Sequence, residues 1–223
     1  MTLIFDWDGT LHDTSRLYGQ AFRCVYRELV EAGWAPDKDY TDEELSVYIG
    51  MNARDMWDAF MPQLPQAVKK AASARIGREL TERIRQGEAR LYDGVPTVLD
   101  ELKRQGHTLL FLSNCKHAYQ EAHREVFDLD RWFSGYFCCE DYNNLPKEEI
   151  FPFLAAQFPG PYLMIGDRAS DLQVALHHGL PSIGCLYGFG APGELDRASR
   201  LVRSCAEIPG CVQKCFLIAA SIV

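Results

Sequence analysis

Thr2-Leu-Ile-Phe-Asp6-Trp-Asp8-Gly-Thr10-Leu, near the beginning of the chain, is the stretch that decides the fold. The apolar run before Asp6 shows no polar alternation, which predicts a strand buried on both faces of a parallel sheet. Asp6 and Asp8 point to the same side while the chain stays extended, and Gly9 then permits a sharp turn. Two neighbouring carboxylates are unstable unless a cation lies between them or one takes up a proton. Taken alone, the stretch predicts either a reactive site or, equally well, an Asx turn with solvated carboxylates.

Length and charge narrow the classes of protein to consider. The chain has 223 residues, enough for one large core or for a core domain with a smaller insertion. Its net charge of −8 argues against nucleic acid or an anionic membrane as the main partner. We expect no secretory signal and no membrane span, because the chain enters a strand at once and lacks an apolar run of about 20 residues.

The number and spacing of the cysteines indicate the redox compartment of the protein. The chain has eight cysteines but no paired C-x-x-C spacing, and Cys138 and Cys139 are adjacent. This arrangement predicts reduced thiols in a cytoplasmic protein rather than zinc ligands.

The rest of the chain falls into two parts with different patterns. Residues 14–91 are charged and helical in pattern, with a long helix predicted over 66–89. From residue 92 onward, helices alternate with apolar strands, the last of them predicted at 181–186. This order predicts an α/β fold: a doubly wound parallel sheet of residues 1–13 and 92–223, with an all-helical domain inserted at 14–91. The apolar tail at 215–223 is expected to pack as a final helix or strand.

Several polar residues follow the predicted strands. In a doubly wound sheet, ligands bind outside the carboxyl ends of the strands, where the strand order reverses. The side chains expected to meet there are carboxylates, a hydroxyl, an amide and an amine: Asp6, Asp8, Ser113, Asn114, Lys147, Asp167 and Asp171. These types suit phosphoryl transfer, which uses a carboxylate nucleophile, a metal held by oxygen atoms and donors around the phosphate.

Four motifs in this order make the chain resemble the haloacid dehalogenase-like hydrolase superfamily over essentially its whole length. Asp6-Trp-Asp8-Gly-Thr10 is similar to that family's first motif, Asp-x-Asp-Gly-Thr, and Ser113-Asn114 to the second. Lys147 resembles the third motif, and Gly166-Asp167-Arg-Ala-Ser-Asp171 the fourth. The helical insertion then corresponds to the family's cap.

The resemblance implies a role for each of these residues. Asp6 would be the nucleophile that forms an aspartyl-phosphate, and Asp8 the general acid and then the general base. The metal, Mg²⁺, would be held by Asp6, the Asp8 main-chain carbonyl and Asp167, with Asp171 in support. The phosphate would be bound by residues of three motifs: Gly9, Thr10, Ser113, Asn114 and Lys147.

Two further residues are weaker candidates for contact with substrate. His12 stands where many relatives have an apolar residue, so it either faces the cap or is simply exposed. Arg54 lies in a predicted cap loop and could bind a carboxylate or second phosphate in bidentate fashion; a solvated arginine is an equally good interpretation.

The resemblance also leaves alternatives for the reaction. An acid at position 8 argues against dehalogenation, since a halide leaves without a proton, and no lysine in the first cap helix could form a Schiff base for phosphonate cleavage. A phosphatase acting on a small phosphorylated metabolite, with phosphoglycolate as the favoured substrate, is therefore predicted. A sugar-phosphate mutase and a non-catalytic binding module remain as alternatives, and the sequence does not give the oligomeric state.

Overall fold

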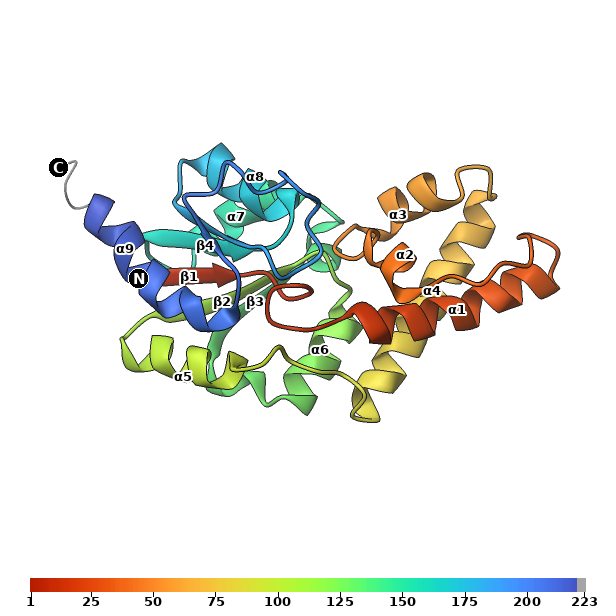
Figure 1. Ribbon diagram of the computed structural model, residues 1–223, viewed down its shortest axis with the longest axis horizontal. Helices are drawn as coiled ribbons and strands as arrows, with labels where there is room; N and C mark the ends of the chain where they lie inside the picture. Colours follow the sequence, from red (N-terminus) through yellow and green to blue (C-terminus); the bar gives the residue numbers. More distant parts are fainter. Residues whose placement is uncertain (220–223) are drawn as a thin grey trace.

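The computed structural model describes residues 1–219 and contains a central parallel sheet with helices on both faces (Figure 1). The strands are β1 (Thr2–Phe5), β2 (Thr108–Ser113), β3 (Phe133–Cys138), β4 (Tyr162–Gly166), β5 (Ser182–Cys185) and β6 (Arg200–Val202). They lie in the order β3-β2-β1-β4-β5-β6, and every neighbouring pair is parallel. The strand order reverses between β1 and β4, so the carboxyl ends of these two strands flank the crevice where such sheets bind ligands. The predicted doubly wound α/β fold is confirmed.

Strand β1 is buried on both faces, as its sequence predicts. Leu3 and Phe5 point into one apolar cluster and Ile4 into the other. The first cluster is covered by α5 (Val95–Arg104), α6 (His117–Val126) and α9 (Ile208–Ala219), and the second by α7 (Lys147–Ala155) and α8 (Ala169–His178). This two-sided cover keeps water from the sheet and fixes the strand ends that carry the polar residues.

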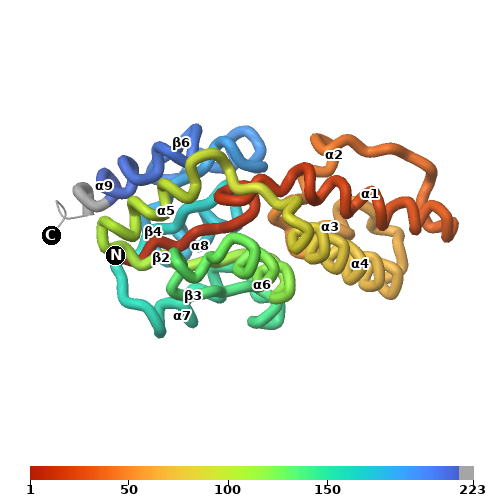
Figure 2. Tube along the Cα trace, turned by 90° about the horizontal axis from the view of Figure 1, so that it is seen from below, coloured from red at the N-terminus to blue at the C-terminus, as the bar shows by residue number. Residues whose placement is uncertain are grey.

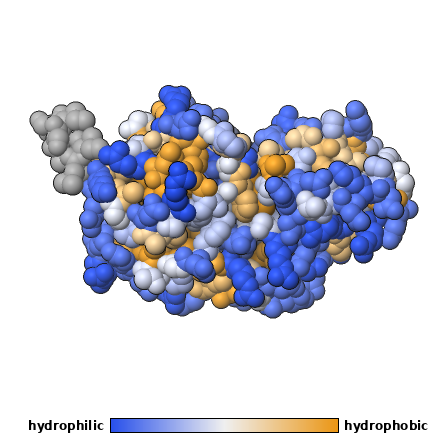
Figure 3. Space-filling model, in the orientation of Figure 1, coloured by the Kyte–Doolittle hydropathy of each residue, from blue (hydrophilic) through white to orange (hydrophobic). Residues whose placement is uncertain are grey.

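The inserted helices lie together beyond the carboxyl ends of the strands (Figures 1 and 2). They are α1 (Ser15–Glu31), α2 (Asp42–Ser46), α3 (Ala53–Phe60) and α4 (Gln66–Arg85). They enclose an apolar cluster of their own, in which the Phe22 ring packs against Trp57 and Phe60. Their outer surface is mostly hydrophilic (Figure 3), so the apolar faces are turned inward.

Three details of the sequence prediction need correction. Helix α4 ends at Arg85 rather than at residue 89, because Gly87 takes a left-handed conformation with φ of 79°. The strand at 181–186 is not the last one, since β6 pairs with β5 through Leu201 and Gly184. With three residues, β6 is too short for its pattern to be recognised. The apolar tail forms the end of α9 as far as Ala219, and residues 220–223 lie outside the described part of the chain.

Each helix among residues 1–219 is too short or too polar to cross a bilayer.

Candidate active site

Three carboxylates and a lysine meet at the crevice between β1 and β4. Asp6 follows β1, Asp167 follows β4, and Asp171 lies in the first turn of α8, with one oxygen of each within 4.8 Å of the others. Lys147, the first residue of α7, places its Nζ 2.5 Å from Asp6 Oδ1 and 2.6 Å from Asp171 Oδ1. All four side chains are buried.

The electrostatics of this cluster are unbalanced. Burial, reinforced by the neighbouring charge of Asp171, raises the pKa of Asp6 to about 7, although Lys147 opposes the shift. Burial together with Asp6 and Asp171 also raises the pKa of Asp167 well above its usual range. Burial alone would lower the pKa of Lys147, but Asp171 and Asp6 outweigh it and raise the pKa. One ammonium thus faces three carboxylates, and a hard divalent cation with oxygen ligands would complete the balance.

Asp167 is held by the loop of residues 187–189, which follows β5 and which the pattern of predicted strands does not indicate. Its Oδ1 accepts a hydrogen bond from Thr10 Oγ1 at 3.1 Å, and its Oδ2 accepts one from the Phe189 backbone N–H at 2.7 Å. A Cβ on Gly188 would lie 2.4 Å from Asp167 Cβ, so only glycine permits this approach. The hydroxyl of Tyr187 donates to the Thr10 carbonyl at 2.8 Å and ties the same loop to the first motif.

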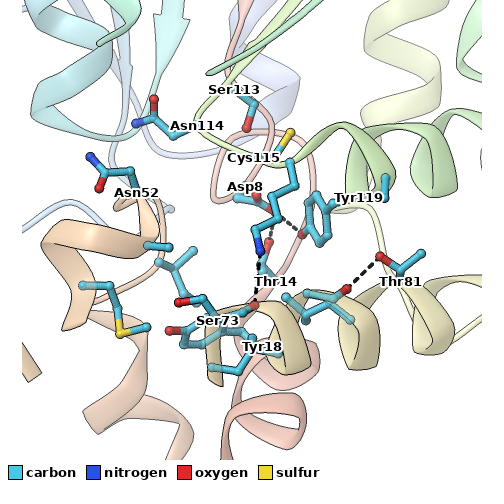
Figure 4. Close-up of a pocket in the computed structure, with 18 of the residues that line it drawn as sticks. Asp8, Thr14, Tyr18, Asn52, Ser73, Thr81, Ser113, Asn114, Cys115 and Tyr119 are labelled. Atoms are coloured by element: carbon cyan, nitrogen blue, oxygen red, sulfur yellow. Dashed lines mark hydrogen bonds between the residues drawn. The ribbon is translucent and has the colours of Figure 1, made fainter. Parts of the chain in front are cut away.

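Asp8, two residues after Asp6, lies within a network of polar side chains. Its Oδ1 accepts hydrogen bonds from Thr14 Oγ1 at 2.5 Å and from Tyr119 OH at 2.6 Å (Figure 4). The same oxygen lies 2.9 Å from His12 Nδ1. Burial acts to raise the pKa of Asp8, but the hydrogen bonds from His12 and Thr14 outweigh it and hold the pKa below its usual value. The carboxyl is therefore fixed in one orientation by three neighbours.

A cavity of about 630 Å³ opens above these residues, between the strand ends and the inserted helices. Asp6, Asp8, Ser113 and Asn114 line it on the sheet side. Apolar and aromatic side chains line much of the opposite wall, among them Tyr18, Tyr48, Met51, Met56, Ile76 and Leu80. Figure 4 shows Ser113 and Asn114 at one side of this space and Tyr18 and Ser73 at the other. The size is that of a pocket for an ordinary small-molecule ligand.

Side chains near the strand ends reach across to the inserted helices. Asn114 Nδ2 donates to the Gly50 carbonyl at 3.1 Å, and Lys116 Nζ donates to the Ser73 carbonyl at 3.2 Å. The guanidinium of Arg168 donates to the Ile49 carbonyl in the inserted segment and also forms an ion pair with Glu194. These bonds join the inserted helices to the strand ends, with side-chain donors on one side and backbone acceptors on the other.

Not every candidate residue reaches the cavity. His12 is fully buried beneath Asp8, and Thr10 is turned toward Asp167, so both lie behind the cavity wall. Gly9 packs against Asp167 with φ of 86°. Arg54 is exposed on α3 and is not among the lining residues, whereas Asn52 and Ala53 beside it are. The substrate contacts expected for His12 and Arg54 therefore have no support in this geometry.

Some residues of the site were missed by the sequence analysis. Thr14 and Tyr119 hold Asp8, and Phe189 holds Asp167 through its backbone. Tyr119 lies 111 positions from Asp8, and a backbone donor carries no residue signature. Only Thr14, next to the first motif, was within reach of sequence reasoning.

Comparisons with known proteins agree with this geometry. Residues 3–185 match the family model described as haloacid dehalogenase-like hydrolase. A 5′-nucleotidase of Pseudomonas aeruginosa is 35% identical over 128 residues, which cover 54% of this chain and 56% of that protein. A phosphoglycolate phosphatase of Agrobacterium fabrum is 27% identical over 83% of this chain and 80% of its own. The crystal structure of a predicted phosphatase from Clostridium acetobutylicum superposes with a TM-score of 0.83 at 22% identity, over 96% of this chain and 98% of that one.

Proposed function

Because the chain belongs to the haloacid dehalogenase-like hydrolase family, we propose that it is a divalent-metal-dependent phosphoric monoester hydrolase. One observation carries the proposal: Lys147 and the carboxylates of Asp6, Asp167 and Asp171 are buried together at the strand-order reversal, beside a cavity that Asp6 and Asp8 also line. The matching relatives that are named by activity include phosphatases and a 5′-nucleotidase.

The proposed reaction has two displacements at phosphorus. A carboxylate oxygen of Asp6 forms a bond to phosphorus while the bond from phosphorus to the ester oxygen breaks, and Asp8 gives its proton to the departing oxygen. Asp8, now ionised, then takes a proton from water. The resulting hydroxide attacks phosphorus and releases phosphate from Asp6.

The network around Asp8 suits this double role. The three neighbouring groups share Oδ1, so Oδ2 is the oxygen that carries the proton to and from the reacting atoms. In the unliganded protein these neighbours favour the ionised form, and a phosphate ester with its own negative charge would shift Asp8 toward the protonated form when it binds.

The remaining motif residues would bind the phosphoryl group. Ser113 is a buried hydroxyl on the cavity wall, and the Asn114 amide lies beside it. Lys147 would neutralise charge on Asp6 and on the phosphoryl oxygens.

The metal in this proposal is Mg²⁺, held by Asp6, the Asp8 carbonyl and Asp167, with Asp171 in support. The donor set fits, since it consists of oxygen atoms alone and its carboxylates repel one another without a cation. When bound, the metal would withdraw charge from the phosphoryl oxygens and orient them for attack.

We also propose that residues 14–91 form a cap domain that moves relative to a core domain of residues 1–13 and 92–223. The inserted helices have their own apolar cluster, and they contact the strand ends through a few hydrogen bonds. Opening about hinges near residues 13–15 and 91–94 would admit substrate, and closure would exclude water during the first step.

Two substrates are proposed, from different observations. Phosphoglycolate is the first, because a relative named phosphoglycolate phosphatase matches most of this chain. A nucleoside 5′-monophosphate is the second, because a 630 Å³ cavity with aromatic and apolar walls exceeds what glycolate needs and suits a base and sugar. The nucleotidase match supports it as well.

All eight cysteines are free thiols, which supports a reducing compartment such as the cytoplasm.

The test is phosphate release from a panel that contains phosphoglycolate, nucleoside 5′-monophosphates and hexose phosphates, with Mg²⁺ or EDTA. We expect release that requires Mg²⁺ and is abolished in Asp6→Asn, with Asp39→Asn, an exposed carboxylate of the inserted segment, as the matched control. Release that persists in Asp6→Asn would refute the nucleophile. Transfer of phosphate between hexose hydroxyls without release would instead establish a mutase.

A further inference from the structure

A second group of possible metal ligands lies outside the candidate active site, where β3 ends beside the start of α6. It consists of His117, Cys138 and Asp141. We propose that these three side chains bind a thiophilic divalent cation of the Zn²⁺ class, at a site separate from the three aspartates. The inference is independent of the proposed function.

The distances suit a small cation. One ligand atom from each residue lies within 4.8 Å of the other two, and His117 Nδ1 is 3.2 Å from Asp141 Oδ2. Bonds of about 2.0 to 2.3 Å from a tetrahedral zinc ion place neighbouring ligand atoms roughly 3 to 4 Å apart. Small side-chain rotations would therefore bring the three atoms into the geometry of the bound state.

The fold brings the three residues together from two segments. Strands β2 and β3 are parallel neighbours, with Ser113 in register with Cys138 at their carboxyl ends. The chain then opens α6 at His117 on one side, and on the other the turn η2 (Cys139–Tyr142) brings Asp141 back over Cys138. Both flanking segments are fixed by the sheet, so the ligands are held by rigid elements.

The donor set differs in kind from that of the candidate active site. Imidazole nitrogen and thiolate sulfur select zinc-like cations, whereas three carboxylates suit Mg²⁺.

The cation can enter from solvent. The side chains of His117 and Asp141 are 55% and 43% exposed, while Cys138 is buried beneath them. Glu140 adds further negative charge, since its carboxylate accepts a hydrogen bond from the His117 backbone N–H at 2.9 Å. An exposed ion pair of histidine and aspartate contributes little by itself, and it does not account for a thiol placed under both groups.

A zinc-class site at these residues differs from the expectation that none of the cysteines is a zinc ligand. The absence of C-x-x-C pairs argues against zinc only when all ligands are cysteines close in sequence. Here the cysteine is joined by a histidine 21 positions before it, through the pairing of β2 with β3.

The experiment is a titration of the full chain with Co²⁺ in excess Mg²⁺, followed by absorption. Only a sulfur ligand produces thiolate-to-cobalt charge transfer, so cobalt at the oxygen-only aspartate cluster is silent in this band. We expect the band in the unmodified protein and in Asp6→Asn, and its loss when Zn²⁺ is added. His117→Ala, at an exposed position, should weaken affinity by more than roughly tenfold, since even outer-shell partners of a metal are worth about 10- to 100-fold.

Two cysteine variants complete the design. Cys138→Ser should abolish the band, and Cys211→Ser, a partly exposed cysteine on α9, should leave it unchanged. If Cys138→Ser fails to fold, Asp141→Asn replaces it, with circular dichroism as the check of folding. No band in the unmodified protein, or an equal band in His117→Ala and the other ligand variants, would overturn the proposal.

Discussion

Asp6→Asn provides the sharpest test of the electrostatics of the candidate site, because it should stabilise the metal-free protein while it abolishes activity. Burial and the neighbouring carboxylates raise the pKa of Asp6 from 3.8 to about 7. A raised carboxyl pKa means that the unfolded chain releases this proton more readily than the folded protein does. The charged Asp6 therefore destabilises the fold, beginning as the pH rises above about 4 and reaching its full cost above about pH 7.

The magnitude follows from the difference between the two pKa values. It amounts to roughly three pH units at about 1.4 kcal/mol each, so ionised Asp6 costs at most about 4 kcal/mol. This cost already includes the favourable pairing of Asp6 with Lys147, so neutral asparagine removes all of it, and Lys147 keeps Asp171 as a buried partner. Even half of this upper limit, about 2 kcal/mol, would raise the melting temperature by roughly 4 to 8 °C in a chain of this length.

The assay is thermal unfolding of the unmodified protein, Asp6→Asn and the exposed control Asp39→Asn in EDTA, from pH 4 to pH 8.5. The stability difference between Asp6→Asn and the unmodified protein should grow between pH 4 and pH 7 and stay constant above. Asp39→Asn should show no such growth. An Asp6→Asn protein that is less stable than the unmodified one throughout this range would refute the reasoning, since it would mean that Lys147 more than balances the buried carboxylates.

Two other substitutions test how the site is held. Tyr119→Phe removes a 2.6 Å hydrogen bond to the proposed general acid. Because hydrogen bonds to charged groups are worth about 1.5 to 3 kcal/mol, kcat should fall roughly 10- to 100-fold. The control is Tyr136→Phe, which loses a hydrogen bond to an exposed carboxylate and should have the kcat of the unmodified enzyme. Equal rates for both variants would exclude the role of Tyr119. Gly188→Ala would place a Cβ 2.4 Å from Asp167 Cβ and displace this carboxylate, so half-maximal activation should require a higher Mg²⁺ concentration. The control is Gly210→Ala on α9, whose Cβ would meet no neighbouring atom within 4 Å and should leave the Mg²⁺ requirement unchanged. An unchanged Mg²⁺ requirement in Gly188→Ala would show that this approach is not needed.

Sequence reasoning reached the fold because the relevant signals are local. The apolar run before Asp6 and the alternation of helices and strands after residue 92 each predict an element from its own residues, and a parallel, doubly wound sheet follows from general rules of connection. The pairing of Asp6 with Lys147 was also accessible, because both lie at predicted element ends on the same edge of the sheet. A single sequence is enough to predict a residue's role when that role depends only on the residue type and on its position at the end of a predicted element.

The parts that were missed depend on packing between distant segments. His12 was treated as a residue that could face the cap, yet the turn after Gly9 folds it under Asp8 among Trp7 and His123. The Nε2 atom of His12 is buried without a hydrogen-bond partner among the described residues, an arrangement that no local pattern indicates. The structure thus places His12 against a neighbouring carboxylate, in a position that its sequence context does not predict.

The bonds that join the inserted helices to the strand ends bear on how the proposed cap could work. Asn114, Lys116 and Arg168 each donate to a backbone carbonyl of the inserted segment rather than to a charged side chain. Such bonds contribute about 1 kcal/mol each when the donor is neutral and about 1.5 to 3 kcal/mol when it is charged, because water offers the same groups alternative partners. Together the three bonds therefore stabilise the closed arrangement by about 4 to 7 kcal/mol, in addition to the apolar packing of Leu17 and Ile84 in the core cluster. Opening of the proposed cap has to break both kinds of contact.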